Sequence, residues 1–198
     1  YIGSYVCNSC TSLEYVKLQG DIKVIPIRAF YNNAKLMNIT IPPTVEIIEK
    51  EVFAKCSSLT SISFPFSVYK LGDYVCSECS SLVSVEFPLN LSPIPSYAFY
   101  SDTQLSAIDI PPCVKNISQF AFSKCNALTS VIIPDTVTIM QNSIFKECAG
   151  LITAKLPFNC SSVPVSMFEL CTSLVTVELP SSIKEFKENS FKSCSSLN

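Results

Sequence analysis

A 23-residue repeat runs through the chain without an insertion or deletion, and it limits the possible folds more than any other feature. A leucine recurs nine times at this spacing, at Leu13, Leu36, Leu59, Leu82, Leu105, Leu128, Leu151, Leu174 and Leu197. Six residues before each leucine stands a residue that we call the anchor: Cys7, Phe30, Phe53, Cys76, Phe99, Phe122, Phe145, Phe168 and Phe191. Such self-similarity is typical of solenoids, in which each unit buries its apolar side chains against its neighbours.

Each unit contains the segment Leu-x-x-(Val/Ile)-x-(Ile/Leu/Phe), which predicts a short strand. Residues 59–64 read LTSISF, so that Ile62 and Phe64 are two positions apart. This alternation is that of a strand with one buried face. Seven of the eight complete units place a proline directly after the strand, at Pro42, Pro65, Pro88, Pro111, Pro134, Pro157 and Pro180. Because proline lacks a backbone N–H, strand pairing should stop at the same height in successive turns.

The rest of each unit is too short and too variable for a long helix. Two apolar positions three residues apart follow the proline, as in Val45 with Ile48 and Val114 with Ile117. The anchor segment comes next, for example residues 121–125, AFSKC. We therefore expect a short extended piece and a single helical or 3₁₀ turn on the convex side of the solenoid.

The segments FAKCSSLTSISFP (residues 53–65) and FSKCNALTSVIIP (residues 122–134) resemble the repeat of the BspA-like leucine-rich-repeat family. That repeat has the signature Ala-Phe-x-x-Cys-x-x-Leu-x-x-Ile-x-Ile-Pro, and the resemblance covers essentially the whole chain. It implies an α/β solenoid, a right-handed superhelix with a parallel concave β-sheet and short 3₁₀ or extended segments on the convex side. Residues 1–198 are expected to form a single domain of about eight and a half repeats, cut within a repeat at both ends.

Seven of the eleven cysteines lie three residues after an anchor: Cys10, Cys56, Cys79, Cys125, Cys148, Cys171 and Cys194. Asn33 and Asp102 take this position in the other two units. Residues 7–10 and 76–79 form C-x-x-C pairs, which in another context would indicate a redox centre or half a zinc site. Here the repeat accounts for all four cysteines, and the chain has no histidine to complete a zinc site. Buried, inert thiols are favoured over disulfides and over metal or redox chemistry, and no cofactor is expected.

Charge and composition argue against several functions. The net charge is −2 and the 14 basic residues are scattered, so the chain lacks the basic stripe that a nucleic-acid partner requires. No apolar run approaches the about 18 residues of a membrane-spanning helix, so direct membrane insertion is not expected. The chain has no histidine, only four glycines and no paired set of carboxylates, and we do not expect it to be an enzyme.

Two columns of side chains should face solvent on the concave sheet, the surface through which solenoids commonly bind partners. Most of the first column is small and hydroxylated, whereas the second varies in charge and size. Glu86 and Asp109 lie on successive turns and should form an acidic spot beside Ile132. The candidate ligand-binding residues of this face are Tyr15, Lys17, Glu86, Asp109, Ile132 and Lys155. The alternative is that these are solvated strand positions without a binding role.

A second candidate surface lies just past the prolines, on the rim of the solenoid. Pro43, Phe66, Leu89 and Pro112 occupy this position on successive turns. A contiguous apolar strip marks an interaction site when it is exposed, and this makes Phe66 and Leu89 candidate binding residues. The alternative is that these side chains cap the end of the sheet core.

Many BspA-like proteins are surface proteins implicated in adhesion to host cells or matrix. The resemblance thus implies a non-catalytic recognition module, cell-surface or secreted, that binds a protein or extracellular-matrix ligand through its concave face. One alternative is an intracellular scaffold for protein–protein interaction, because many unpaired thiols suit a reducing compartment. Another is an array that self-associates through its uncapped ends.

Overall fold

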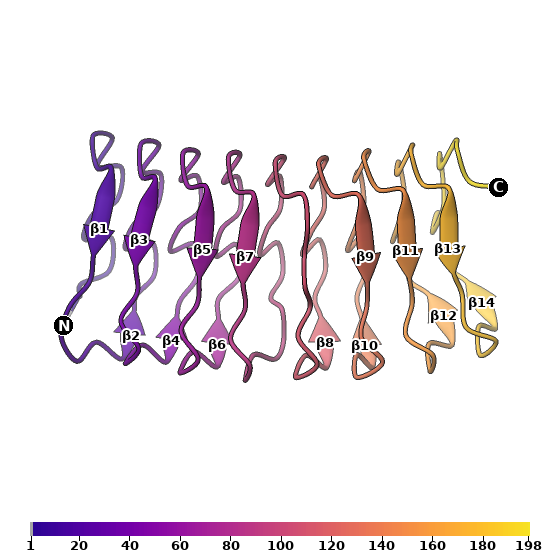
Figure 1. Ribbon diagram of the computed structural model, residues 1–198, viewed down its shortest axis with the longest axis horizontal. Coiled ribbons are helices and arrows are strands. Elements are labelled where there is room, and N and C mark those ends of the chain that lie inside the picture. The colour runs from indigo at the N-terminus through magenta and orange to yellow at the C-terminus, as the bar shows by residue number, and fades with distance from the viewer. Residues whose placement is uncertain (1) are drawn as a thin grey trace.

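The computed structural model describes residues 2–198, in which short parallel strands stack into a β-solenoid (Figure 1). Three-residue strands form the first sheet: β1 (Tyr15–Lys17), β3 (Asn38–Thr40), β5 (Ser61–Ser63), β7 (Ser84–Glu86), β9 (Ser130–Ile132), β11 (Thr153–Lys155) and β13 (Thr176–Glu178). Two-residue strands form the second sheet: β2 (Val24–Ile25), β4 (Ile47–Ile48), β6 (Lys70–Leu71), β8 (Asn116–Ile117), β10 (Ile139–Met140), β12 (Ser162–Val163) and β14 (Glu185–Phe186). We name each turn after its anchor, so that the Phe99 turn comprises residues 99–121.

The strands pair in parallel at the register that the repeat predicts. Val131 of β9 lies opposite Ala154 of β11, which lies opposite Val177 of β13, each 23 residues further along the chain. The middle residue of each strand points into the core, and the residues on either side of it face solvent. Seven of the eight predicted strands, with their buried face, are therefore confirmed. We call the solvent-facing side of the first sheet the strand face.

The first sheet is interrupted at two places. Its hydrogen-bonded ladders are β1–β3, β5–β7 and β9–β11–β13. Residues 107–109 stand at the expected strand position of the Phe99 turn, but they form no strand and pair with neither β7 nor β9. Between β3 and β5 the ladder is also absent, although the two strands remain neighbours. In the first sheet the Phe99 turn thus lacks the strand pairing that its neighbours have, whereas in the second sheet its strand β8 pairs with β10.

Residues 2–198 contain neither an α-helix nor a 3₁₀-helix, so the expected α/β class and the expected 3₁₀ turns are wrong. Within residues 2–198, all eighteen non-glycine residues with positive φ lie two positions before or two positions after an anchor. Phe120 (φ 56°) and Lys124 (φ 65°) flank Phe122 in this way. A helix requires consecutive residues in the right-handed region, and these left-handed residues interrupt it. The anchor segments are tight turns instead, whereas the predicted extended segments are present as the second sheet.

A single apolar core runs along the solenoid axis between the two sheets. The leucines of the repeat are fully buried from Leu36 to Leu174. The anchor rings stack in parallel on successive turns, with the centroids of Phe99 and Phe122 5.6 Å apart and an interplanar angle of 5°. The same stacking continues through Phe145, Phe168 and Phe191. Each unit therefore obtains its core contacts from the turns before and after it, which makes the solenoid stable only as a stack.

Candidate protein-interaction surface

The strand face is most varied on β9, β11 and β13. Ile132 is 66% exposed on β9, and Lys155 lies directly opposite it on β11. The Nζ atom of Lys155 is 3.2 Å from a carboxylate oxygen of Glu178 on β13. An isolated large apolar side chain therefore stands beside a cation and an anion at fixed strand spacing. The structure brings Ile132 and Lys155 together, as the sequence predicted.

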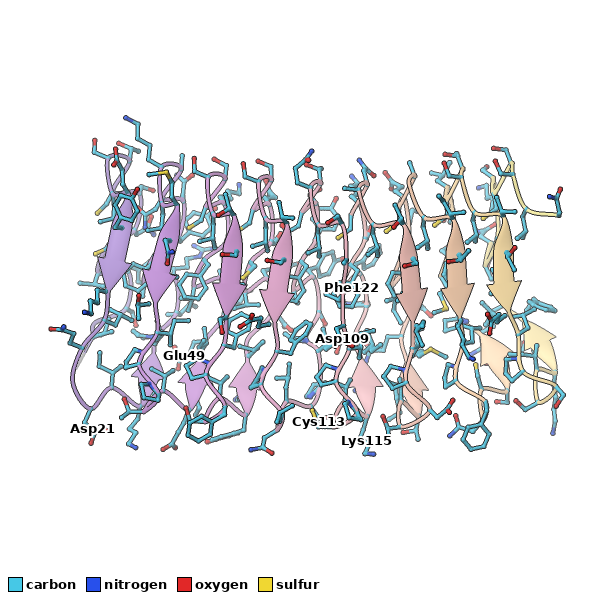
Figure 2. The ribbon with its side chains drawn as sticks, viewed as in Figure 1. Asp21, Glu49, Asp109, Cys113, Lys115 and Phe122 are labelled. Atoms are coloured by element: carbon cyan, nitrogen blue, oxygen red, sulfur yellow. The ribbon has the colours of Figure 1, made fainter. Side chains whose placement is uncertain are left out.

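Glu86 and Asp109 are both exposed, but strand pairing does not hold them together. Glu86 is the last residue of β7, and Asp109 lies in the unpaired segment between β7 and β9 (Figure 2). They belong to successive turns, so both carboxylates face the side of the sheet on which Ile132 lies. Because the Phe99 turn makes no ladder here, the spacing of the two carboxylates is set by the turns and not by hydrogen-bonded strands. The sequence contains no signal that marks this interruption.

Tyr15 and Lys17 do not join the other candidates of the strand face. Both lie on β1, which pairs only with β3. Their side chains are exposed, with Lys17 opposite Thr40. The eight predicted residues therefore fall into three groups: these two at the first strand, four in the region from β7 to β11, and two on the rim.

Phe66 and Leu89, on the rim, are 70% and 71% exposed, so the alternative that they cap the core is wrong. The reason is the turn that each proline begins. The N–H of Val68 donates to the carbonyl oxygen of Pro65 (3.0 Å), which closes a tight turn. Phe66 is the second residue of this turn and points away from the sheet. Pro43 and Pro112 are also exposed, so each of four successive turns exposes an apolar side chain at this position of the rim.

The repeated cysteines are structural, and their environment makes them poor nucleophiles. Burial raises the pKa of the Cys148 thiol to about 12, and it also raises the pKa of the Cys125 thiol. A reactive cysteine requires a lowered pKa, because the thiolate is the nucleophile. All eleven cysteines are free, and seven of them are buried. Cys10 is the exception to the expected packing, since it is exposed.

An aromatic ladder that runs along the anchor segments was not predicted. The rings of Tyr74 and Tyr97 stack with centroids 4.6 Å apart, and Phe120 stacks on Tyr97 at 4.7 Å. The ammonium group of Lys50 lies 5.5 Å from the centroid of the Tyr74 ring. These three aromatic residues stand two positions before successive anchors, so their spacing in the repeat could have predicted that they stack. Their faces cover one another, which indicates a role in holding turns together.

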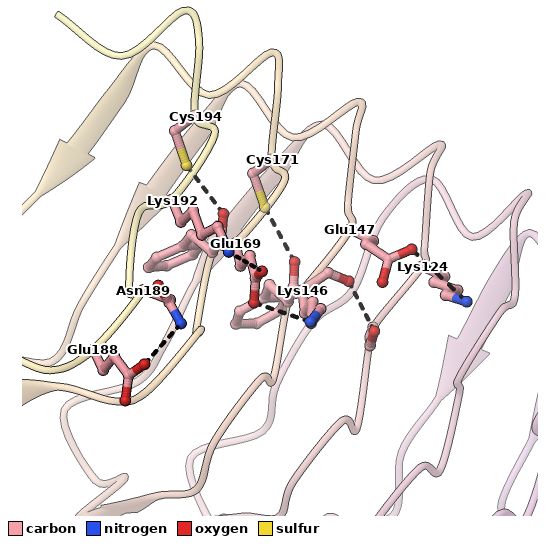
Figure 3. A network of polar contacts seen from close by, with 12 residues as sticks. Lys124, Lys146, Glu147, Glu169, Cys171, Glu188, Asn189, Lys192 and Cys194 are labelled. Carbon is pink, nitrogen blue, oxygen red and sulfur yellow. Dashed lines mark hydrogen bonds and ion pairs between the residues drawn. The ribbon is translucent and has the colours of Figure 1, made fainter.

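A ladder of charges continues along the same side (Figure 3). The carboxylate of Glu169 lies 2.9 Å from the Nζ atom of Lys146 and 3.7 Å from that of Lys192. Its hydrogen bond with Lys146 is the main reason that the pKa of Glu169 lies below its ordinary value. Lys124 and Glu147 form a longer pair at 3.7 Å. Like the aromatic ladder, these pairs join each turn to the next.

Across residues 2–198, no group of three or more His, Cys, Asp or Glu side chains is arranged to hold a metal ion. Within the same residues, no helix is long and apolar enough to cross a membrane.

Together, the stacked 23-residue units, the two parallel sheets and the stacked rings of the anchor residues define a leucine-rich-repeat β-solenoid. The chain belongs to the family of the BspA type leucine rich repeat region, whose model matches residues 1–105 and 72–198 in 6 copies. Proteins of this class are typically non-catalytic and generally bind other proteins. No curated protein matches the chain.

Solved structures with the same fold come from several bacteria. A leucine-rich repeat protein of T. pallidum has a TM-score of 0.73 and 24% identity, over 92% of this chain and 81% of the other. A leucine rich cell surface protein of Faecalibacterium prausnitzii has a TM-score of 0.63 and 24% identity, over 98% and 55%. A leucine-rich repeat protein of Bacteroides ovatus has a TM-score of 0.51 and 23% identity, over 98% and 68%. The chain therefore spans about half the length of the cell surface protein, and identities this low establish the fold alone.

Proposed function

We propose that residues 1–198 act as a single non-catalytic recognition domain, which binds a protein or extracellular-matrix ligand through the strand face. The observation that carries this proposal is the row formed by Ile132, Lys155 and Glu178. A large apolar side chain that is 66% exposed stands there in register with a cation and an anion. Elsewhere most of the face is small and polar, so this row offers the chemistry from which a specific contact can be built.

The acidic side chains beside this row set the kind of ligand that fits. Glu86 and Asp109 are exposed on the preceding turns, and the cation that follows Ile132 is already neutralised by its own partner. A ligand surface with an apolar side chain for Ile132 and a basic group for the two carboxylates complements this arrangement. The exposed rim strip with Phe66 and Leu89 extends the apolar part of the proposed surface.

The proposed place of action is the cell surface or the extracellular space. Support comes from the similar F. prausnitzii structure, which is described as a leucine rich cell surface protein. An intracellular scaffold is the second candidate, and the eleven free cysteines favour it, because such thiols persist in a reducing compartment. We also propose a role in adhesion, and the binding experiment below tests it because its ligands are matrix proteins.

Binding to immobilised fibronectin, laminin and collagen tests the strand face directly. We expect the wild-type protein to bind at least one of them, and the double variant Glu86→Lys with Asp109→Lys to bind at least tenfold more weakly. The matched control is Glu185→Lys with Glu188→Lys, which makes the same change in charge at exposed residues of the second-sheet side and should bind as the wild type does. Equal loss in both variants would mean that net charge and not the strand face governs binding. Absence of wild-type binding to all three would overturn the matrix-ligand proposal.

A further inference from the structure

The cysteines three residues after the anchors from Phe53 to Phe191 share one recurring hydrogen bond. The thiol of Cys56 donates to the carbonyl oxygen of Phe30 at 3.2 Å, and that of Cys125 donates to Phe99 at 3.2 Å. The acceptor is in each case the anchor of the preceding turn. The same bond joins Cys79 to Phe53, Cys148 to Phe122, Cys171 to Phe145 and Cys194 to Phe168. A hydrogen-bond donor is thus the common property of this position.

Asn33 shows that the position does not require sulfur. Its Nδ2 group donates to the carbonyl oxygen of Cys7, the preceding anchor, at 2.9 Å. An amide therefore replaces the thiol and keeps the donor. Asp102 is the other natural substitution at this position, and an ionised carboxylate has only acceptors.

Asp102 is fully buried and only half satisfied. Its Oδ1 atom accepts the N–H of Cys79 at 2.8 Å, whereas its Oδ2 atom has no hydrogen-bond partner among residues 2–198. The acceptor that the repeat assigns to this side chain is the carbonyl oxygen of Cys76, the preceding anchor. A proton on Oδ2 would give the side chain the donor that every equivalent side chain from Asn33 to Cys194 uses at this position. The same proton would remove the cost of an unpaired buried charge.

The surroundings of Asp102 favour the protonated form. The titratable groups that face it from the turns on either side are Cys76, Glu78, Cys79 and Cys125, and none of them is cationic. Glu78 is an anion, and it pairs with Lys55 at the surface (3.8 Å). Burial raises the pKa of Asp102 well above its ordinary value, the N–H of Cys79 opposes this shift, and the charge of Glu78 adds to it.

We propose that Asp102 is a neutral carboxylic acid whose Oδ2–H donates to the carbonyl oxygen of Cys76, and that loss of this proton loosens the Phe99 turn. Ionisation would leave a buried charge without a counter-ion and two oxygen acceptors facing each other. The same turn carries residues 107–109, which pair with neither neighbouring strand. The loosened segment includes Asp109, so the pH-sensitive turn lies within the strand face. This inference does not depend on the proposed function.

The sign of the pH dependence follows from a pKa that is raised in the folded protein. Below the ordinary aspartate pKa of about 3.9, both the folded and the unfolded chain hold the proton, and stability is complete. As the pH rises, the unfolded chain releases the proton and the folded chain keeps it, so stability falls. The fall ends once the pH exceeds the folded pKa of Asp102, where both states are ionised.

Unfolding of wild type, Asp102→Asn and Asp102→Cys between pH 4.5 and 8.5 tests the proposal. The two variants recreate the donors that Asn33 and the repeated cysteines supply. We expect the stability of both variants to increase relative to that of the wild type as pH rises. The expected change is up to tenfold in the folding equilibrium constant per pH unit. Asp135→Asn, an exposed control, should show no such slope. A difference that does not vary with pH would overturn the proposal.

A spectroscopic readout keeps the proposal testable if the variants fail to fold. The infrared spectrum of the folded wild-type protein at pH 7 should contain the carbonyl band of one protonated carboxyl group. That band should shift when the protein is labelled with ¹³C at aspartate Cγ. If the folded wild-type protein at pH 7 shows no such band, neither unlabelled nor at the shifted position after labelling, Asp102 is ionised and the proposal is contradicted.

Discussion

The thiol of Cys148 donates a hydrogen bond of 3.1 Å to the carbonyl oxygen of Phe122, which precedes it by 26 residues. This bond joins one turn of the solenoid to the turn before it, and the same relationship recurs along the stack (Figure 3). The same carbonyl oxygen also accepts the N–H of Cys125 within its own turn, at 3.4 Å, so the thiol is a second donor that comes from the next turn. A small buried donor at this position therefore explains why the repeat carries so many cysteines without disulfides or a metal site.

Thiol alkylation should separate these cysteines by burial. At pH 8, iodoacetamide should modify the exposed Cys10 first and leave Cys148 unmodified in the folded protein, because its pKa is about 12 and it is buried. Peptide mass spectrometry after timed labelling measures this order. Addition of denaturant should abolish the difference. Equal rates for Cys10 and Cys148 in the native protein would contradict the packing role.

Leu128→Asp should unfold several turns of the solenoid. Leu128 is fully buried, and a carboxylate there would be desolvated without a partner, at a cost of at least about 4 kcal/mol. Ser130→Asp is the matched control, since Ser130 is exposed on β9 two residues away. Thermal unfolding followed by circular dichroism should show a large loss of Tm for the first variant only. Unchanged melting of Leu128→Asp would contradict the repeat register.

Gly150→Ala should destabilise the protein because of a backbone contact between turns. A Cβ atom at Gly150 would overlap the carbonyl oxygen of Asn126 in the preceding turn. Relief requires the backbone to shift, and we expect a loss of about 1–3 kcal/mol in the free energy of unfolding. A Cβ atom at Gly3 would meet nothing within 4 Å, so Gly3→Ala serves as the control. Denaturant titrations of both variants measure the difference, and equal stabilities would show that the turns are not in such close contact.

Glu169→Gln should lower stability only where the carboxylate is ionised. Lys146 and Lys192 hold the pKa of Glu169 below its ordinary value, so its contribution is present above about pH 4.3 and is lost as pH falls through the folded pKa. The expected loss at pH 7 is about 1 kcal/mol, since the pair with Lys146 is mostly buried. Unfolding at pH 7 and pH 3 measures it. A deficit of the same size at both values would refute an electrostatic origin.

The sequence predicted the register, the strands and the core because these follow from the phase of the repeat. Leu128 and Phe122 could be placed in the core from spacing alone. The absence of helix could not be predicted, because residues such as Phe120 and Lys124 adopt positive φ without being glycine or asparagine. The phase of the repeat favours a strand at residues 107–109, but no strand forms there.

The candidate surface was predicted only in part, for similar physical reasons. Strand alternation placed Ile132 and Lys155 side by side, since register decides which side chains are neighbours. It could not decide whether Phe66 is exposed, because this depends on the tight turn that Pro65 begins. The role of Asp102 could not be predicted either. Its hydrogen-bond partners lie in the preceding turn, and they become apparent only in the stacked structure.

Antibody labelling of intact and permeabilised source cells tests most directly the central claim, that this solenoid recognises a ligand outside the cell. Labelling of intact cells is the predicted result, with little increase after permeabilisation. Labelling that appears only after permeabilisation would contradict recognition at the cell surface and would favour the intracellular scaffold.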